Sequence, residues 1–211
     1  AIVGPNGAGK TSLLRLLGLL EKPTQGRLVF QDQDTTALWP HCLPLRRRLG
    51  FLHQQPLLFR GTVADNLAAP LKYRRLPRVL RRQRVEKILT DFGLTHLARR
   101  PAGQLSGGEA QKVALARIMT FDPAVILLDE PTANLDPYNT LKFEELLADI
   151  HQQKDLTIIL VTHDLGQAAR LSQQLLFLHQ GRLLETGPTQ RVLGQPEHEK
   201  TRLFLNQGLV V

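Results

Sequence analysis

Hydrophobic residues along the chain form short continuous runs, and most of these runs end in polar or charged residues. Three runs lie at 49–52, 125–128 and 156–161, and a fourth, at 1–3, leads into a glycine-rich loop. Continuous apolar runs of this length are typical of parallel strands, which are buried on both faces. Because helical apolar spacing at 13–17 follows the first loop, the pattern predicts an α/β fold with a parallel sheet. Ligands of such sheets bind at the carboxyl ends of the strands.

The composition indicates a globular chain with a basic surface. A chain of 211 residues, 42% of them hydrophobic, buries a substantial core. The formal charge of +8 and the sequence pI near 10.1 would attract nucleic acid or an anionic membrane surface. Cys42 is the only cysteine, which excludes an internal disulfide and favours a reducing compartment, the cytoplasm. The apolar runs fall far short of the roughly 18 to 20 residues that cross a bilayer, so we expect a partner to supply any membrane contact.

Residues 4–11 match the phosphate-binding pattern G-x-x-x-x-G-K-[ST]. The glycines let successive backbone N–H groups face phosphate oxygens, and the following helix adds the positive end of its dipole. We expect Lys10 to reach the β- and γ-phosphates, Thr11 to bind Mg²⁺ and Ser12 to contact a phosphate oxygen. The predicted nucleotide-binding residues of this loop are Gly4, Pro5, Asn6, Gly7, Ala8, Gly9, Lys10, Thr11 and Ser12.

The apolar run at 123–128 ends in two carboxylates, Asp129 and Glu130. An isolated Asp-Glu pair often only caps a helix or forms salt bridges. After a phosphate loop, however, the pattern favours a catalytic pair, because both motifs would lie at the same edge of the sheet. We expect Asp129 to hold Mg²⁺ through water and Glu130 to polarise the water that attacks the γ-phosphate. ATP and Mg²⁺ are therefore the predicted cofactors.

A third motif, Leu-Ser-Gly-Gly-Glu at 105–109, lies between the phosphate loop and the acidic strand end. Ser106 and Glu109 have the spacing of a helix capping box. The order of the three motifs resembles an ATP-binding cassette, the motor subunit of an ABC transporter. The resemblance implies a P-loop NTPase (RecA-like) core with a parallel sheet and an inserted α-helical subdomain carrying the signature motif. The predicted bounds are a single ABC ATPase domain at 1–211, with its core at 1–65 and 106–190, the helical subdomain at 66–105 and a C-terminal tail at 191–211.

The resemblance assigns roles to further residues. His163, at the end of the run 156–162, resembles the switch histidine that contacts the γ-phosphate and orients Glu130. A histidine at a strand end is otherwise most often structural. Gln54 is expected to complete the Mg²⁺ shell, although the adjacent Gln55 leaves the choice between the two glutamines open. The predicted catalytic residues are thus Glu130 and His163, and the predicted metal ligands are Thr11, Gln54 and Asp129.

The resemblance also implies that two cassettes pair, as a homodimer or as two different cassettes. Each ATP would lie between one chain's phosphate loop and the other chain's signature residues, and Asp136 would touch the opposite subunit. The trans contacts would come from Ser106, Gly107 and Gly108. Besides the phosphate loop, the predicted cofactor-binding residues are Gln54, Ser106, Gly107, Gly108, Glu109 and Asp136. Integral membrane permease subunits and an extracytoplasmic substrate-binding protein are the other implied partners, and no nucleic acid is expected. The implied location is the cytoplasmic face of the inner membrane, reached through the permease.

The chain begins with Ala1, immediately before the phosphate loop. Family members carry antiparallel strands and an adenine-stacking aromatic residue upstream of this loop, so we expect the chain to be N-terminally truncated. The stretch 66–104 is rich in Lys and Arg and lacks strong strand patterns. Such a charge run is most often a solvated helix face. Contact with a permease loop or with anionic headgroups is the alternative.

Three segments are similar to importers of oxyanions, especially tungstate, with molybdate and phosphate systems nearby. They lie at 54–66, 131–137 and 199–208. Because these residues would not touch the cargo, the oxyanion prediction rests on resemblance alone. Another ABC importer or exporter remains an alternative. A soluble ABC ATPase acting on nucleic acid is a further one, and the basic charge is its only support.

Overall fold

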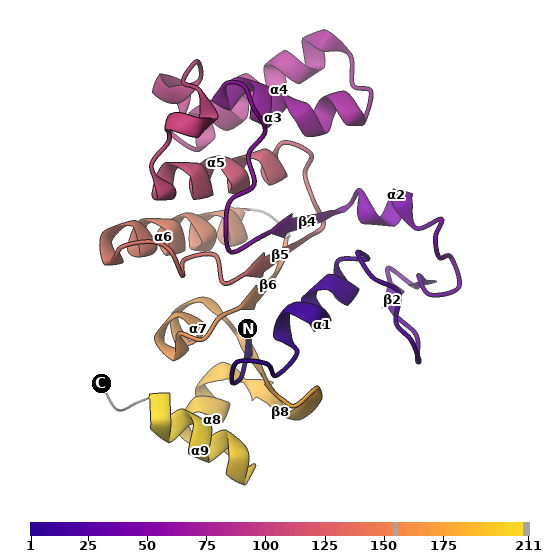
Figure 1. The fold of residues 1–211 in the computed structure, drawn as a ribbon, viewed down its shortest axis with the longest axis vertical. Coiled ribbons are helices and arrows are strands. Elements are labelled where there is room, and N and C mark those ends of the chain that lie inside the picture. The colour runs from indigo at the N-terminus through magenta and orange to yellow at the C-terminus, as the bar shows by residue number, and fades with distance from the viewer. Residues whose placement is uncertain (154–155, 209–211) are drawn as a thin grey trace.

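The structure, a computed structural model, describes residues 1–153 and 156–208. In this part of the chain a twisted sheet of six strands has the order β4-β5-β6-β1-β7-β8, with helices on both faces (Figure 1). All neighbouring pairs are parallel except β7 and β8. The predicted α/β fold with a mainly parallel sheet is therefore confirmed. The strands are β1 (Ile2–Val3), β4 (Leu49–Leu52), β5 (Val125–Asp129), β6 (Thr157–Val161), β7 (Gln174–His179) and β8 (Arg182–Pro188).

The burial of strand β5, which lies between β4 and β6, explains why its sequence is apolar without alternation. Ile126, Leu127 and Leu128 are all at most 1% exposed. Leu127 packs with Leu14 of α1 (Lys10–Leu17) in one cluster, whereas Ile126 and Leu128 pack in the cluster that contains Val113 on the other face. Successive side chains of a strand point to opposite faces, so both faces of β5 must be apolar. The carboxyl end of β5 can then present the carboxylates of Asp129 and Glu130 next to a rigid core that excludes water.

The helices that follow the strands pack against this core. Phe143 and Leu147 of α6 (Pro137–Gln153) join the same cluster as Leu128. Ala168 of α7 (Leu165–Leu171) and Val192 of α8 (Thr189–Gly194) pack with Phe177 of β7. The last helix, α9 (Glu199–Gly208), lies in the predicted C-terminal tail, of which 209–211 lie outside the described residues. Residues 154–155 of the predicted core lie outside them as well.

A helical unit lies at one end of the molecule, above the sheet in Figure 1. It comprises α3 (Val63–Tyr73), α4 (Arg78–Asp91), two short 3₁₀ helices (Thr95–Leu97 and Ala102–Gln104) and α5 (Gly107–Met119). Helix α3 thus begins three residues before the predicted subdomain boundary at 66, and the boundaries at 65/66 and 105/106 stay a prediction. Leucines of α3 and α4 are buried against α5 in the largest apolar cluster, so this cluster joins the helical unit to the sheet.

Residues 19–46 form a small arm that the hydrophobic pattern did not reveal. It contains the antiparallel pair β2 (Val29–Phe30) and β3 (Gln33–Asp34), and the short helix α2 (Leu43–Arg46). Cys42 is buried there as a free thiol beside Leu19 and Leu45. Strands of two residues are too short to show a period in the sequence, which is why the arm escaped prediction.

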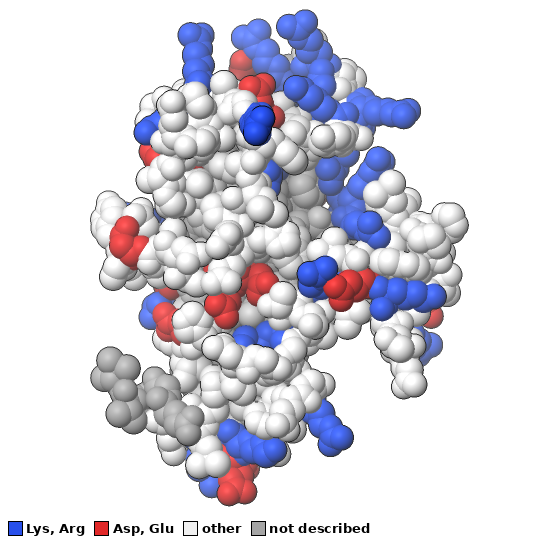
Figure 2. Space-filling view, viewed as in Figure 1, with Lys and Arg blue, Asp and Glu red and all other residues white. Residues whose placement is uncertain are grey.

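Lys and Arg side chains gather over the helical unit, at the upper end of Figure 2. Part of this charge is paired, because Arg82 contacts Glu86, Arg84 contacts Asp122 and Lys87 contacts Asp91. These pairs are solvent-exposed, so they contribute little to stability. None of the helices in the described ranges is long and apolar enough to cross a membrane.

Candidate active site

Three neighbouring strands bring the predicted catalytic motifs to one edge of the sheet. In the order β5-β6-β1, the chain leaves β5 at Asp129, β6 at Val161 and β1 at Val3. Parallel strands place their carboxyl ends together. The phosphate loop, the acidic pair and the segment of His163 therefore converge, although they are far apart in the sequence.

The phosphate loop depends on glycine at two positions for different reasons. A Cβ on Gly4 would lie 2.0 Å from the carbonyl oxygen of Leu178, so only glycine lets the loop leave the sheet this close to β7. Gly9 has a φ of 95° and is the N-cap of α1, a conformation that glycine adopts without steric cost. No side chain caps the first turn of α1. Its N–H groups are therefore available to an anion.

Lys10 lies inside this loop and is only 6% exposed. Its Nζ donates hydrogen bonds to the carbonyl oxygens of Gly4, at 2.8 Å, and Pro5, at 3.0 Å. Burial lowers the pKa of Lys10, while the negative charges of Glu130 and Asp129 act to raise it. The loop therefore holds a buried amine next to two carboxylates, an arrangement that suits a polyanionic ligand.

Thr11 and Asp129 meet across the gap between α1 and β5. The Thr11 hydroxyl donates to Oδ1 of Asp129 at 3.1 Å. Burial raises the pKa of Asp129, and the hydrogen bond from Thr11 acts in the opposite direction. A hydroxyl beside a carboxylate offers the hard oxygen ligands that Mg²⁺ prefers, and Mg²⁺ keeps several waters or phosphate oxygens as its other ligands. The donor set therefore fits Mg²⁺, even though the described residues contain no cluster of three His, Cys, Asp or Glu side chains that could hold a metal.

Glu130 and His163 are in direct contact. Nδ1 of His163 lies 3.3 Å from Oε2 of Glu130. Glu130 has a φ of 45°, a left-handed conformation that is uncommon for a residue with a side chain, and its N–H donates to the carbonyl oxygen of Val161 at 2.9 Å. This turn at the end of β5 aims the carboxylate of Glu130 toward the segment that follows β6. The Glu130 side chain is 20% exposed and that of His163 is 62% exposed, so water reaches the pair.

Gln54 lies after β4 and is exposed. Its carbonyl oxygen accepts a hydrogen bond from Nδ2 of Asn134 at 3.4 Å, whereas its side chain has no hydrogen-bond partner among the described residues. The neighbouring His53 ring packs on Phe51 with 4.6 Å between centroids. Burial lowers the pKa of His53, and Asp129 acts to raise it. Metal binding by Gln54 stays a prediction, because the contact described for Gln54 is made by its backbone oxygen and not by its side chain.

The signature segment forms its own helix cap. The N–H of Glu109 donates to Oγ of Ser106 at 3.3 Å, and the N–H of Ser106 donates to Oε2 of Glu109 at 2.8 Å, which is the predicted capping box. Asp136 caps the start of α6 by accepting a bond from the N–H of Asn139 at 2.9 Å. A Cβ on Gly108 would come within 2.9 Å of the Asn139 side chain. Within the described ranges, no hydrogen bond joins 106–109 to the phosphate loop.

A family model described as ABC transporter matches residues 1–133. The chain belongs to the ABC transporter family. A methionine import ATP-binding protein MetN from Xanthomonas campestris pv. campestris (strain 8004) is 42% identical over 209 residues, which cover 98% of this chain and 62% of that protein. A phosphate import ATP-binding protein PstB 2 from Natronomonas pharaonis is 40% identical and is covered to 77%, with all of this chain aligned. This chain therefore spans less than two thirds of the MetN relative.

Two solved structures have the same fold. CbiO1 from Clostridium perfringens, described as part of the ABC transporter complex cbiONQ, superposes with a TM-score of 0.85 at 29% identity over 99% of this chain and 82% of that chain. A dimeric ATP-binding cassette in a post-hydrolysis state with bound ADP and Pi superposes with a TM-score of 0.77 at 32% identity. That match covers 89% of this chain and 84% of the other. These similarities confirm the predicted P-loop NTPase fold.

The structure adds contacts that sequence reasoning missed in this ABC cassette. Nε2 of Gln111, in α5, donates to the carbonyl oxygens of Pro131 at 2.8 Å and His53 at 3.4 Å. Gln111 thereby ties the signature helix to the loops after β5 and β4. A glutamine inside a helix is normally exposed, so nothing in the sequence indicated that Gln111 is buried. Its place in the signature helix was the one feature that linked it to the site.

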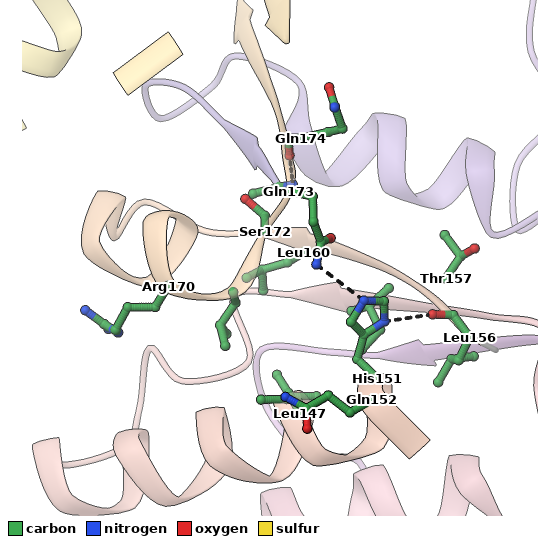
Figure 3. Close-up of a pocket in the computed structure, with 14 residues that line it drawn as sticks. Leu147, His151, Gln152, Leu156, Thr157, Leu160, Arg170, Ser172, Gln173 and Gln174 are labelled. Atoms are coloured by element: carbon green, nitrogen blue, oxygen red, sulfur yellow. Dashed lines mark hydrogen bonds between the residues drawn. The ribbon is translucent and has the colours of Figure 1, made fainter. Parts of the chain in front are cut away.

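A cavity of about 620 Å³ lies apart from these residues, between α6, β6 and the segment after α7 (Figure 3). His151 lies at its centre, with Nδ1 3.1 Å from the carbonyl oxygen of Leu156 and Nε2 3.3 Å from Nε2 of Gln173. Arg170 borders the cavity, but its side chain points away from His151 in Figure 3. None of the predicted catalytic or nucleotide-binding residues lines this cavity.

Proposed function

We propose that this chain is the ATP-binding and ATP-hydrolysing motor of an ABC importer, with Mg-ATP as its cofactor. The observation that carries the proposal is the convergence of two contacts on adjacent strand ends, Thr11 with Asp129 and Glu130 with His163. The first pair supplies oxygen ligands for Mg²⁺. The second supplies a base and its orienting partner.

In this proposal the chain's own groups perform distinct tasks. The amides of 4–9 and the first turn of α1 bind phosphate oxygens, and Lys10 turns from the loop carbonyls toward the β- and γ-phosphates. Glu130 accepts a proton from the attacking water, and His163 orients Glu130 and contacts the γ-phosphate. Bound Mg²⁺ would neutralise the charge that develops on the phosphate oxygens. Hydrolysis then requires little covalent chemistry from the protein, because positioning and charge stabilisation supply most of the catalysis.

We further propose that two cassettes pair head to tail. The solved cassette with ADP and Pi, which is 32% identical to this chain, is dimeric, and this supports the pairing of two cassettes. In the pair, Ser106, Gly107 and Gly108 of one chain would face the phosphates bound by the other, and Asp136 would contact the opposite chain. Membrane permease subunits and an extracytoplasmic binding protein complete the proposed importer, which places the motor at the cytoplasmic face of the membrane.

The hydrolysis proposal is tested in the full-length protein with Glu130→Gln. We expect ATP binding to persist while turnover falls about 10²–10⁴-fold, the usual contribution of a positioned base. Glu145→Gln is the matched control, because Glu145 is an exposed carboxylate of α6 that pairs with Lys142. Normal turnover in the Glu130→Gln protein, measured by phosphate release, would contradict the assignment of the base.

For the cargo, we propose an inorganic oxyanion: tungstate, molybdate or phosphate. The PstB 2 relative is a phosphate import ATP-binding protein that aligns with all of this chain and is covered to 77%, which supports an oxyanion. The similarity to MetN favours methionine as a second candidate. Cells carrying the intact gene or its Glu130→Gln version would be compared for tungsten, molybdenum and phosphorus content and for uptake of labelled methionine. A selective fall in one cargo names it, a fall in methionine alone removes the oxyanion proposal, and no change in any of them removes both.

A further inference from the structure

A buried carboxylate lies behind the proposed catalytic pair. Glu144, in α6, is 4% exposed. It accepts two hydrogen bonds from Arg170, in α7, from Nε to Oε2 at 2.8 Å and from Nη2 to Oε1 at 2.8 Å. Gln167, one turn earlier in α7 and also buried, donates to Oε1 of Glu144 at 3.1 Å. The two helices are thus joined by a bidentate charged pair and by a hydrogen bond from a neutral amide to the same carboxylate.

The same network reaches both segments that carry the catalytic pair. Nε2 of Gln167 also donates to the Thr132 hydroxyl at 2.8 Å, and Thr132 follows Glu130 by two residues. Nη2 of Arg170 lies 3.9 Å from Oδ2 of Asp164, and Asp164 directly follows His163. The contacts therefore form a closed ring, because Glu130 and His163 themselves touch at the other side.

The geometry of this ring is more specific than packing requires. Apolar side chains would bury the same surfaces of α6 and α7 without the cost of removing a charged carboxylate from water, so a buried ion pair is weak evidence for stability. Directional bonds, in contrast, fix the rotation of α7 relative to the loop after β5. That rotation sets the distance between the His163 ring and the Glu130 carboxylate, since the His163 side chain is otherwise 62% exposed.

We propose that Glu144, Gln167 and Arg170 are positioning residues that hold His163 against Glu130 by tying α7 to the loop after β5. In this proposal they bind neither the nucleotide nor the attacking water, and they act through the two catalytic side chains. The inference rests on the proposed ATP hydrolysis.

The main test uses Glu144→Gln in the full-length protein. This substitution keeps the size of the side chain and removes the charge that Arg170 contacts. We expect kcat for ATP hydrolysis to fall about tenfold, because small misplacements of catalytic groups cost up to about a hundredfold. The KM and the Kd for ATP stay within about twofold, since Lys10 and Thr11 lie on other elements.

Glu185→Gln is the matched control for the loss of a buried carboxylate. Glu185, in β8, is 7% exposed and accepts bonds from the N–H groups of Glu197 and His198, away from the catalytic pair. It should lower thermal stability and leave kcat unchanged. If Glu144→Gln folds poorly, Thr132→Val replaces it, because that variant removes the bond from Gln167 while keeping the side chain's shape. A kcat that falls equally in Glu185→Gln would overturn the positioning role.

A double-mutant cycle with His163→Ala separates positioning from stability. If Glu144 acts through His163, Glu144→Gln causes no further loss of kcat in the His163→Ala protein, while it still lowers the melting temperature of that protein. An equal kcat loss in both backgrounds, or a loss of ATP binding, would contradict the inference.

The His163 imidazole resonances give a readout that does not need turnover. In Glu144→Gln they should move toward those of Glu130→Gln, because both changes weaken the same contact. If the unmodified protein hydrolyses no ATP, the proposed function fails, and the resonances still decide whether the network positions His163. Unmoved resonances would overturn the inference even in an active enzyme.

Discussion

The two halves of the proposed ATP site differ in how much of their geometry a single chain supplies. The phosphate-loop half consists of residues 4–12 with Asp129, Glu130 and His163. Its groups already touch one another, as the contacts of Thr11 with Asp129 and of His163 with Glu130 show. The parallel sheet produces this convergence, so a folded monomer already brings together the residues that we propose for hydrolysis.

The signature half consists of Ser106–Glu109 and Asp136, and its contacts are local. Ser106 and Glu109 cap their own helix, and Asp136 caps α6. Because Oγ of Ser106 accepts a bond from Glu109, its hydroxyl hydrogen remains available as a donor. One half is thus organised by long-range contacts within the chain. The other is folded by local contacts and, in our proposal, binds its ligand only across a pair of chains.

The largest effect is expected from Lys10→Ala, which breaks the phosphate-loop half. Removing a preorganised charge at the transferring phosphate reduces turnover roughly 10²–10³-fold. Lys200→Ala is the control, because Lys200 is exposed on α9. Phosphate release measures both. Turnover within twofold of normal in Lys10→Ala would contradict the role of this half, since Lys10 would then not bind the reacting phosphate.

The trans arrangement of the signature half is tested by placing Ser106→Arg and Glu130→Gln in the same copy or in opposite copies of a mixed dimer. If each site is built from the phosphate loop of one chain and the signature of the other, placing the two changes in opposite copies leaves one site with both Ser106 and Glu130 intact. Placing both changes in one copy then damages each site once. The dimer with opposite copies should therefore hydrolyse more ATP. The reverse ranking indicates that each chain uses its own signature.

A smaller effect separates the capping role of Ser106 from its proposed ligand role. Ser106→Ala and Thr62→Ala each remove an N-cap that accepts a bond from the third helical residue, so each should lower the unfolding free energy by about 0.5–2 kcal/mol. Only Ser106→Ala should also lower turnover. Denaturant titration and phosphate release give the two quantities. Equal turnover in both variants would indicate that Ser106 acts only as a helix cap and not as a ligand of the nucleotide.

The smallest expected effect is on how folding stability depends on pH, and its sign is opposite in the two halves. Hydrogen bonds from Ser106 lower the pKa of Glu109 below 4.5, so the charged cap stabilises the fold above that pH and its contribution is lost as pH falls through the lowered pKa. Burial raises the pKa of Asp129 above 3.8, so its charge destabilises the nucleotide-free fold at neutral pH.

These signs predict how two isosteric variants respond to acid. Relative to the unmodified protein, Glu109→Gln should be less stable at pH 7, and Asp129→Asn should be more stable. Both differences should shrink as the pH is lowered toward 3, in urea titrations without nucleotide or Mg²⁺. Differences that stay constant with pH would contradict the assigned shifts.

Some elements of the two halves could be predicted from the sequence, and others could not. The runs that became β4, β5 and β6 were readable because buried parallel strands are apolar on both faces. The capping box was readable because its partners are three residues apart. The arm at 19–46 was missed, since its strands have two residues each. The roles of Gln111 and Glu144 were missed as well, because polar residues at helical positions look like surface residues until the packing is known.

The sequence alone carried the local features: a loop with the phosphate-binding pattern, a carboxylate pair after a buried strand, and a signature segment with the spacing of a helix cap. Spacing and side-chain chemistry suffice for these, because the interacting atoms are near one another in the chain. The contacts of Thr11 with Asp129, of His163 with Glu130 and of Glu144 with Arg170 between α6 and α7 are visible only in the folded chain. Such contacts join residues 26 to 118 positions apart. They depend on strand order and helix rotation, which no local pattern encodes.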